Sequence, residues 1–174
     1  MQAGSEMYDK SEALKPIRPL VAQLADDDAG VREKSRERLI HLGGHEVIRS
    51  LVSALIDPRT HVRWEAAKAL QAIADPVSAP ALVHALDDED EDVRWVAAEG
   101  LIALDKIGLL TVLSGLIKRA GSIPFCKSAH HVLREVNAYA RVLEPVREAL
   151  EQSNCAVTVP RAAFQAPVAL SRTP

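Results

Sequence analysis

The sequence predicts an all-α protein, a right-handed α-solenoid of about four helical hairpins plus a C-terminal capping helix. One phrase recurs every 31 residues, as Val31-Arg32, Val62-Arg63-Trp64 and Val93-Arg94-Trp95. A period of this length indicates helical units that cannot bury their apolar faces alone and therefore stack on one another. Leucines keep the same period in two series: Leu20, Leu51, Leu82 and Leu113, and Leu39, Leu70 and Leu101.

Each unit is predicted to hold two helices separated by a polar or proline-containing turn. The first helix has one apolar face, formed in the first unit by Ile17, Leu20 and Leu24. A segment such as 26–30, which contains three aspartates followed by Ala29 and Gly30, then interrupts the helix and caps the positively polarised start of the next one. The expected helix pairs are 16–24 with 31–42, 46–56 with 62–74, 78–86 with 93–104, and 107–119 with 125–136.

Helix-breaking residues mark the ends of these segments. Gly43-Gly44 ends the first pair, and Pro58 lies where the start of a new helix tolerates proline. The acidic turn 87–92 divides the third pair and is expected to be a solvated helix cap. A last helix over 140–152 is expected to cover the open end of the stack.

The chain divides into three predicted segments. Residues 1–10 form a polar N-terminal leader, residues 11–152 form the solenoid, and residues 153–174 form a C-terminal tail. Helical periodicity stops at Ser153, and three prolines are spread through the tail, so we expect it to be mobile. Its apolar residues leave open that it docks along the solenoid or on a partner.

Composition limits the classes of function. The chain has 174 residues, 48% of them apolar, and a net charge of −3, which disfavours nucleic acid and anionic membranes as partners. The first ten residues lack an apolar signal core, and no apolar run is long enough to span a bilayer, so we expect a cytoplasmic protein. Cys126 and Cys155 have no metal-site spacing and are expected to be reduced thiols.

The phrase from Val62 to Leu70, VRWEAAKAL, followed by Ile73-Ala74-Asp75-Pro76, resembles the short HEAT-like repeat first named for phycobilisome (PBS) lyases. The resemblance covers residues 17–136 and implies an α-solenoid. Resembling families include bilin lyases, metal-dependent hydroxylases, DNA-repair proteins and adaptors.

Two of these families require residues that the chain lacks. The hydroxylases carry paired His-Glu dipeptides in several repeats, whereas this chain has only His45-Glu46. The DNA-glycosylase relatives use a basic groove. Here the expected groove carries acidic side chains that would repel phosphate, namely Glu33, Glu37, Glu65 and Glu99.

The second helix of each unit is predicted to present an exposed ridge, the concave surface of such solenoids. A helical wheel turns Val62, Ala66 and Leu70 inward and leaves Trp64 and Lys68 outside. Aligned across the repeats, the ridges give an apolar patch rimmed by charge, which is typical of an interaction site. The candidate binding residues are Trp64, Trp95, Lys68, Glu99, Gln71, Ile102, Lys127 and His131.

The two tryptophans also have a structural interpretation, because either could lie flat on a neighbouring helix and complete inter-repeat packing. A second periodic series is interpreted as structural. Each arginine of the repeated phrase follows an aspartate by six residues, which predicts an Asp–Arg ladder linking turn to turn along the stack. Its members are Asp26, Arg32, Asp57, Arg63, Asp88 and Arg94.

No catalytic motif, cofactor or metal site is predicted. His130 and His131 diverge by about 100° on a helix and therefore do not converge on one metal. We interpret the sequence as a protein-binding adaptor or scaffold whose partner is another protein, and we do not expect an enzyme. The alternative is a bilin-lyase-like or cofactor-maturation subunit that holds a tetrapyrrole-bearing client or another client protein.

Overall fold

The computed structural model describes residues 16–152 and 155–170, so the predicted leader over residues 1–10 lies outside the described residues. Within these residues the chain forms ten α-helices and two short 3-10 turns, with no strand. The helices are α2 (Ile17–Gln23), α3 (Ala29–Leu42), α4 (Gly44–Ala54), α5 (Thr60–Ile73), α6 (Ala79–Ala85), α7 (Glu91–Ala103), α8 (Asp105–Arg119), α9 (Ile123–Glu135), α10 (Ala140–Glu151) and α11 (Cys155–Leu170). The 3-10 turns are Pro76–Ser78, before α6, and Asn137–Tyr139, before α10.

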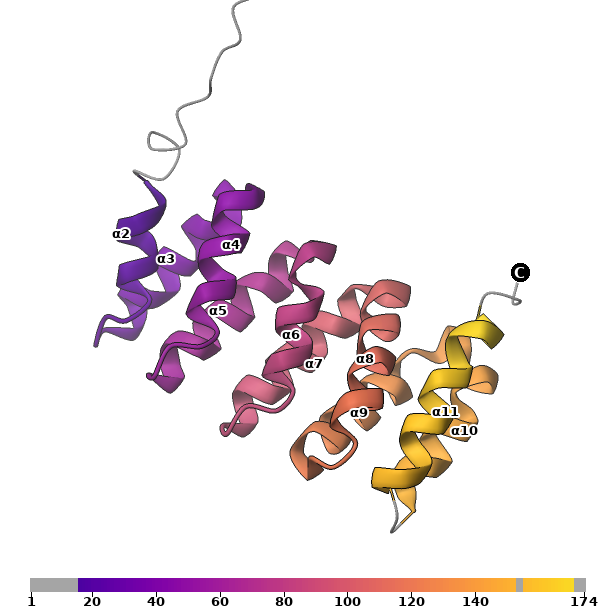
Figure 1. Cartoon of the computed structure of the whole chain (residues 1–174). Coiled ribbons are helices and arrows are strands. Elements are labelled where there is room, and N and C mark those ends of the chain that lie inside the picture. The colour runs from indigo at the N-terminus through magenta and orange to yellow at the C-terminus, as the bar shows by residue number, and fades with distance from the viewer. Residues whose placement is uncertain (1–15, 153–154, 171–174) are drawn as a thin grey trace, which may run out of the picture.

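The helices stack as sequential pairs in two layers (Figure 1). We call α2, α4, α6, α8 and α11 the first layer, and α3, α5, α7, α9 and α10 the second layer. Within the second layer, α5 packs between α3 and α7, and α9 packs between α7 and α10. The predicted all-α solenoid of paired helices is confirmed.

Aspartate and serine side chains cap the starts of α3, α7 and α9, whereas α5 and α10 begin without a side-chain cap. Asp28 accepts hydrogen bonds from the backbone N–H groups of Gly30 and Val31, and Asp90 does the same for Asp92 and Val93. These bonds satisfy donors that the first helical turn leaves unpaired. The acidic turns before α3 and α7 therefore cap helices, as the sequence predicts, whereas the turn at Asp57 does not cap α5.

The core lies between the two layers. Both leucine series are at most 9% exposed, from Leu20 to Leu113, so the period of the sequence is the period of the packing. Glycine allows the closest contact between neighbouring helices. A Cβ on Gly108 of α8 would lie 1.9 Å from the carbonyl oxygen of Leu101 in α7.

The C-terminal end differs from the prediction. The prediction of a mobile tail is wrong for residues 155–170. These residues form helix α11, which packs against α8 and α10. Its buried residues follow a helical spacing that the two internal prolines, Pro160 and Pro167, obscured in the sequence. The residues that α11 buries are Val159, Ala163, Ala166 and Leu170.

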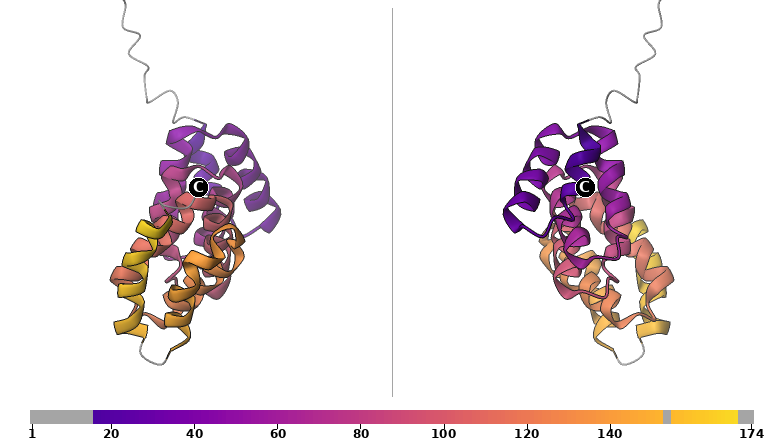
Figure 2. Two further views of the ribbon diagram at one scale, coloured as in Figure 1. Left: turned by 90° about the vertical axis from the view of Figure 1, so that its right-hand side faces the viewer. Right: turned by 90° about the vertical axis from the view of Figure 1, so that its left-hand side faces the viewer.

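The last helix pair also reverses the order of the layers. In the earlier pairs the first-layer helix comes first, whereas here α10 continues the second layer from α9 and α11 returns to the first layer against α8. Figure 2 shows α10 and α11 side by side at this end of the stack. The expected single capping helix over 140–152 is thus one half of a capping pair.

Candidate functional site

The arginines of the repeated phrase shape the turns of their own units. Arg32, Arg63 and Arg94 each donate from Nη1 to the main-chain carbonyl oxygen six residues earlier, at 2.8, 3.0 and 2.8 Å. These carbonyl oxygens belong to Asp26, Asp57 and Asp88. Within a unit the contact is therefore guanidinium to backbone and not guanidinium to carboxylate.

The carboxylates of the same aspartates fold the turns. Asp26, Asp57 and Asp88 each accept the backbone N–H two residues later, at 2.9 Å in all three units. A side chain that bonds its own backbone in this way fixes the turn locally. The aspartate and the arginine six residues later therefore stabilise the same turn. The aspartate carboxylate accepts a backbone N–H bond, and the arginine guanidinium donates to a backbone carbonyl oxygen.

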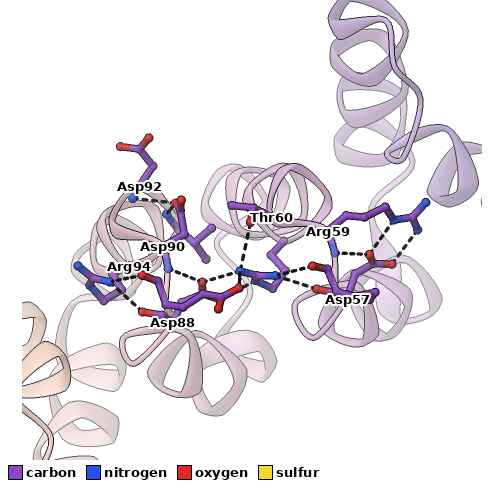
Figure 3. Close-up of polar contacts among 11 residues, drawn as sticks. Asp57, Arg59, Thr60, Asp88, Asp90, Asp92 and Arg94 are labelled. Carbon is purple, nitrogen blue, oxygen red and sulfur yellow. Dashed lines mark hydrogen bonds and ion pairs between the residues drawn. The ribbon is translucent and has the colours of Figure 1, made fainter.

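One contact links two turns along the stack. Arg63 donates from Nε and Nη2 to the two carboxylate oxygens of Asp88, at 2.8 and 3.0 Å, and Nη2 also reaches Glu89 at 2.9 Å. Figure 3 shows Asp57 and Asp88 on neighbouring turns. Hydrogen bonding to Asp88 raises the pKa of the Arg63 guanidinium above its ordinary value. This bidentate pair is buried and is the strongest kind of side-chain contact in the turns.

The equivalent contact is missing on either side of this pair. Asp57 pairs instead with Arg59, through two bonds of 2.9 Å, and that hydrogen bonding lowers the pKa of Asp57 to about 2. On the other side, the position 31 residues after Asp88 is Arg119. Among the described residues, the turn-to-turn Asp–Arg ladder therefore consists of the Arg63–Asp88 link.

Glu65 is placed differently from the prediction. Its position in the repeat predicts a side chain on the exposed face, but Glu65 is only 5% exposed. It pairs with Arg36 in a short contact, and Nε of Arg32 lies 3.4 Å from its Oε1. Glu65 points toward the preceding helix, α3, where Arg32 and Arg36 compensate its charge.

The structure separates the two tryptophans. Trp64 on α5 is half-buried against the core, with the guanidinium of Arg36 5.6 Å from its ring centroid. Trp95 on α7 is 56% exposed. Trp64 thus fits the interpretation that the tryptophans pack between repeats. Trp95 is the tryptophan whose exposure fits binding to a partner.

Trp95 is held in place by residues of the neighbouring repeat. Its ring stacks on the imidazole of His131 in α9, with centroids 4.4 Å apart and an interplanar angle of 25°. His131 Nε2 lies 2.9 Å from Oε1 of Glu99, which is on α7. An exposed aromatic side chain fixed in this way loses little freedom when it binds a partner.

Trp95 and His131 line an open groove of about 350 Å³ between α7 and α9. Ala98, Ile123 and Pro124 add apolar surface, and Ile123 is 68% exposed. Charged side chains form the rim. The charged, aromatic and exposed apolar residues of its lining are Glu91, Arg94, Trp95, Ile123, Lys127 and His131.

The other predicted binding residues do not line this groove. Lys68 donates to Gln71 at 3.0 Å, and Ile102 packs against the core. Sequence reasoning missed Ile123 and Pro124, which lie at the start of α9 and which the analysis assigned to a turn. In the sequence they appear only as an apolar residue beside a proline at the start of a helix. That pattern does not predict a binding surface unless the position of α7 across the groove is known.

The described residues hold no group of three or more His, Cys, Asp and Glu side chains arranged to bind a metal ion. No helix in that part of the chain combines the length and apolar character needed to cross a membrane. The features of the groove are therefore its apolar surface and its charged side chains.

A stack of helix pairs with turns of this construction defines a class, the α-solenoid repeat proteins. Within that class, a model of the HEAT-repeat family matches residues 17–102, which run from the start of α2 into the last turn of α7. This part of the chain is a HEAT-repeat region, and HEAT repeats generally mediate protein–protein interactions. No curated protein matches the chain.

Proposed function

We propose that the protein is a scaffold that binds another protein through the groove between α7 and α9, with Trp95 as the central anchor. The single observation that carries this proposal is an indole 56% exposed and already held by the His131 stack. Tryptophan dominates protein interfaces because one rigid side chain covers a large area. Ile123 and Pro124 extend the apolar surface around it.

The location of the groove supports the same role. It opens between successive second-layer helices, so each of its walls is a rigid element supported by the core. The groove is open to solvent, and its apolar centre with a charged rim is the anatomy of a protein interface. The likeness of residues 17–136 to the PBS-lyase type of repeat supports a client-holding role at the level of the family.

Trp95→Ala is expected to weaken binding while leaving the fold intact. Random peptides displayed on phage and selected on the immobilised protein supply the probe, since the natural partner is unidentified. We expect the selected peptides to lose about 2 kcal/mol of affinity, roughly thirtyfold, on the Trp95→Ala protein. The thermal midpoint of unfolding should stay within a few degrees of the parent.

Trp64→Ala is the matched control, because it removes the same side chain from the same position of the preceding repeat. Its indole packs on the core and on Arg36, so the expected result is a loss of about 2 kcal/mol of stability. Peptide binding by the remaining folded protein should fall much less than with Trp95→Ala. If Trp95→Ala destabilises the fold and Trp64→Ala does not, the assignment of the two tryptophans is reversed.

A further inference from the structure

Two cations beside Trp95 have no carboxylate partner in the part of the chain that the structure describes. Lys127 is exposed at the rim of the groove, and none of the ion pairs there includes it. Arg94 uses Nη1 for the carbonyl oxygens of Asp88 and Glu89, which leaves Nε and Nη2 for another acceptor. Glu91 is the one acidic residue in the lining, so the groove has a net positive charge.

The opposite side of α7 has the opposite charge. There a second groove of about 460 Å³ lies against α5 and includes Trp64, Asp90 and Asp92. The two aspartates belong to no ion pair among the described residues. Arg32 is the one Arg or Lys side chain in this lining, and it is already engaged with backbone carbonyl oxygens and Glu65.

His61 gives this second groove a further polar group. Its Nε2 is buried and has no hydrogen-bond partner among the described residues, although it lies in the groove lining. A polar atom left in this way is costly unless a ligand or water reaches it. The α5–α7 groove therefore has two carboxylates outside any ion pair, one of which also caps α7, and a ring nitrogen without a hydrogen-bond partner among the described residues, whereas the α7–α9 groove has two cations outside any ion pair.

We propose that the partner is an extended protein segment with a fixed direction across α7. An apolar side chain contacts Trp95, an acidic side chain reaches Lys127 and Arg94, and a basic side chain reaches Asp90 and Asp92. This inference rests on the proposed function and names the chemistry of its partner. Complementary charges of this kind select orientation and partner more than they add affinity.

The separation of the two grooves sets the spacing of the charged residues in the partner. Packed helices lie about 8–10 Å apart, and an extended chain advances about 3.3 Å per residue. The acidic and basic residues of the segment should therefore be about three residues apart, with the apolar residue on the acidic side. A reversed order would place each charge against its own sign.

The test selects random displayed peptides on the full chain and then exchanges one charge. We expect the parent protein to enrich peptides with an acidic and a basic residue at this spacing. Lys127→Glu should weaken such a peptide by roughly tenfold, because an attraction at the rim becomes a repulsion. A peptide with Lys in place of its acidic residue should then bind the Lys127→Glu protein more tightly than the parent.

Lys106→Glu is the matched control, since it makes the same charge change at an exposed site on α8, in the other layer. An equal loss of binding in Lys106→Glu would show a general field effect and overturn the inference. Peptides that depend on Trp95 but show no charge preference, or no rescue, would overturn it while leaving the proposed function standing. If no selected peptide depends on Trp95, the proposed function fails and the inference fails with it.

Discussion

Arg63→Ala is expected to lower the free energy of unfolding by about 3–5 kcal/mol, the usual cost of removing one partner from a buried ion pair. The Arg63 side chain is 7% exposed and Asp88 is 9% exposed, so the remaining carboxylate would be left with little solvent. The carbonyl oxygens of Asp57 and Pro58 would lose their donor as well. Urea unfolding followed by circular dichroism measures the effect.

Arg59→Ala provides the control for this prediction. It removes an arginine only four positions away, and that arginine also makes a bidentate pair, with Asp57. Its side chain is 51% exposed, and exposed ion pairs contribute little to stability because solvent screens them. Equal destabilisation by the two variants would contradict the claim that the Arg63–Asp88 link holds neighbouring turns together.

Gly108→Ala is expected to destabilise the protein by about 3 kcal/mol or more, at the upper end of what overpacking costs. The added Cβ would lie 1.9 Å from the carbonyl oxygen of Leu101 and 2.8 Å from its carbonyl carbon. Both are backbone atoms, so α7 and α8 would have to move apart. The expected observation is a large fall in the thermal midpoint with retained helical content at low temperature.

Gly121→Ala is the control, because a Cβ there would have no atom within 4 Å. It should change stability by less than about 0.5 kcal/mol, as exposed substitutions usually do. A small effect at Gly108 would mean that α8 does not approach α7 as closely as the structure shows.

The sequence period was enough to predict the stack, because one buried leucine per helix recurs at the repeat spacing. It was not enough at the C-terminal end. Helix α11 contains Pro160 and Pro167, which ordinarily argue against a helix interior. The four apolar residues that α11 buries against the preceding helices decide its conformation, and packing of that kind is invisible in a local pattern.

The repeat position of a residue was not enough to predict whether it lies in the site. Trp64 and Trp95 occupy the same position of successive units, so their own helices present them identically. Their surroundings differ because the guanidinium of Arg36 on α3 lies over the ring of Trp64, whereas the imidazole of His131 on α9 stacks on the ring of Trp95. The aspartate–arginine spacing was informative in the same partial way: it located the turns, but not the carbonyl oxygens that the guanidinium groups bind.

We propose the groove at Trp95 as the surface that binds a partner. The chain has two tryptophans, so a ¹⁵N-labelled sample should give two indole N–H resonances, assigned by Trp64→Ala and Trp95→Ala. On titration with a selected peptide, we predict that the Trp95 resonance shifts while the Trp64 resonance, from the half-buried ring, changes much less. A bound peptide that shifts the Trp64 resonance and leaves Trp95 unchanged would contradict the account.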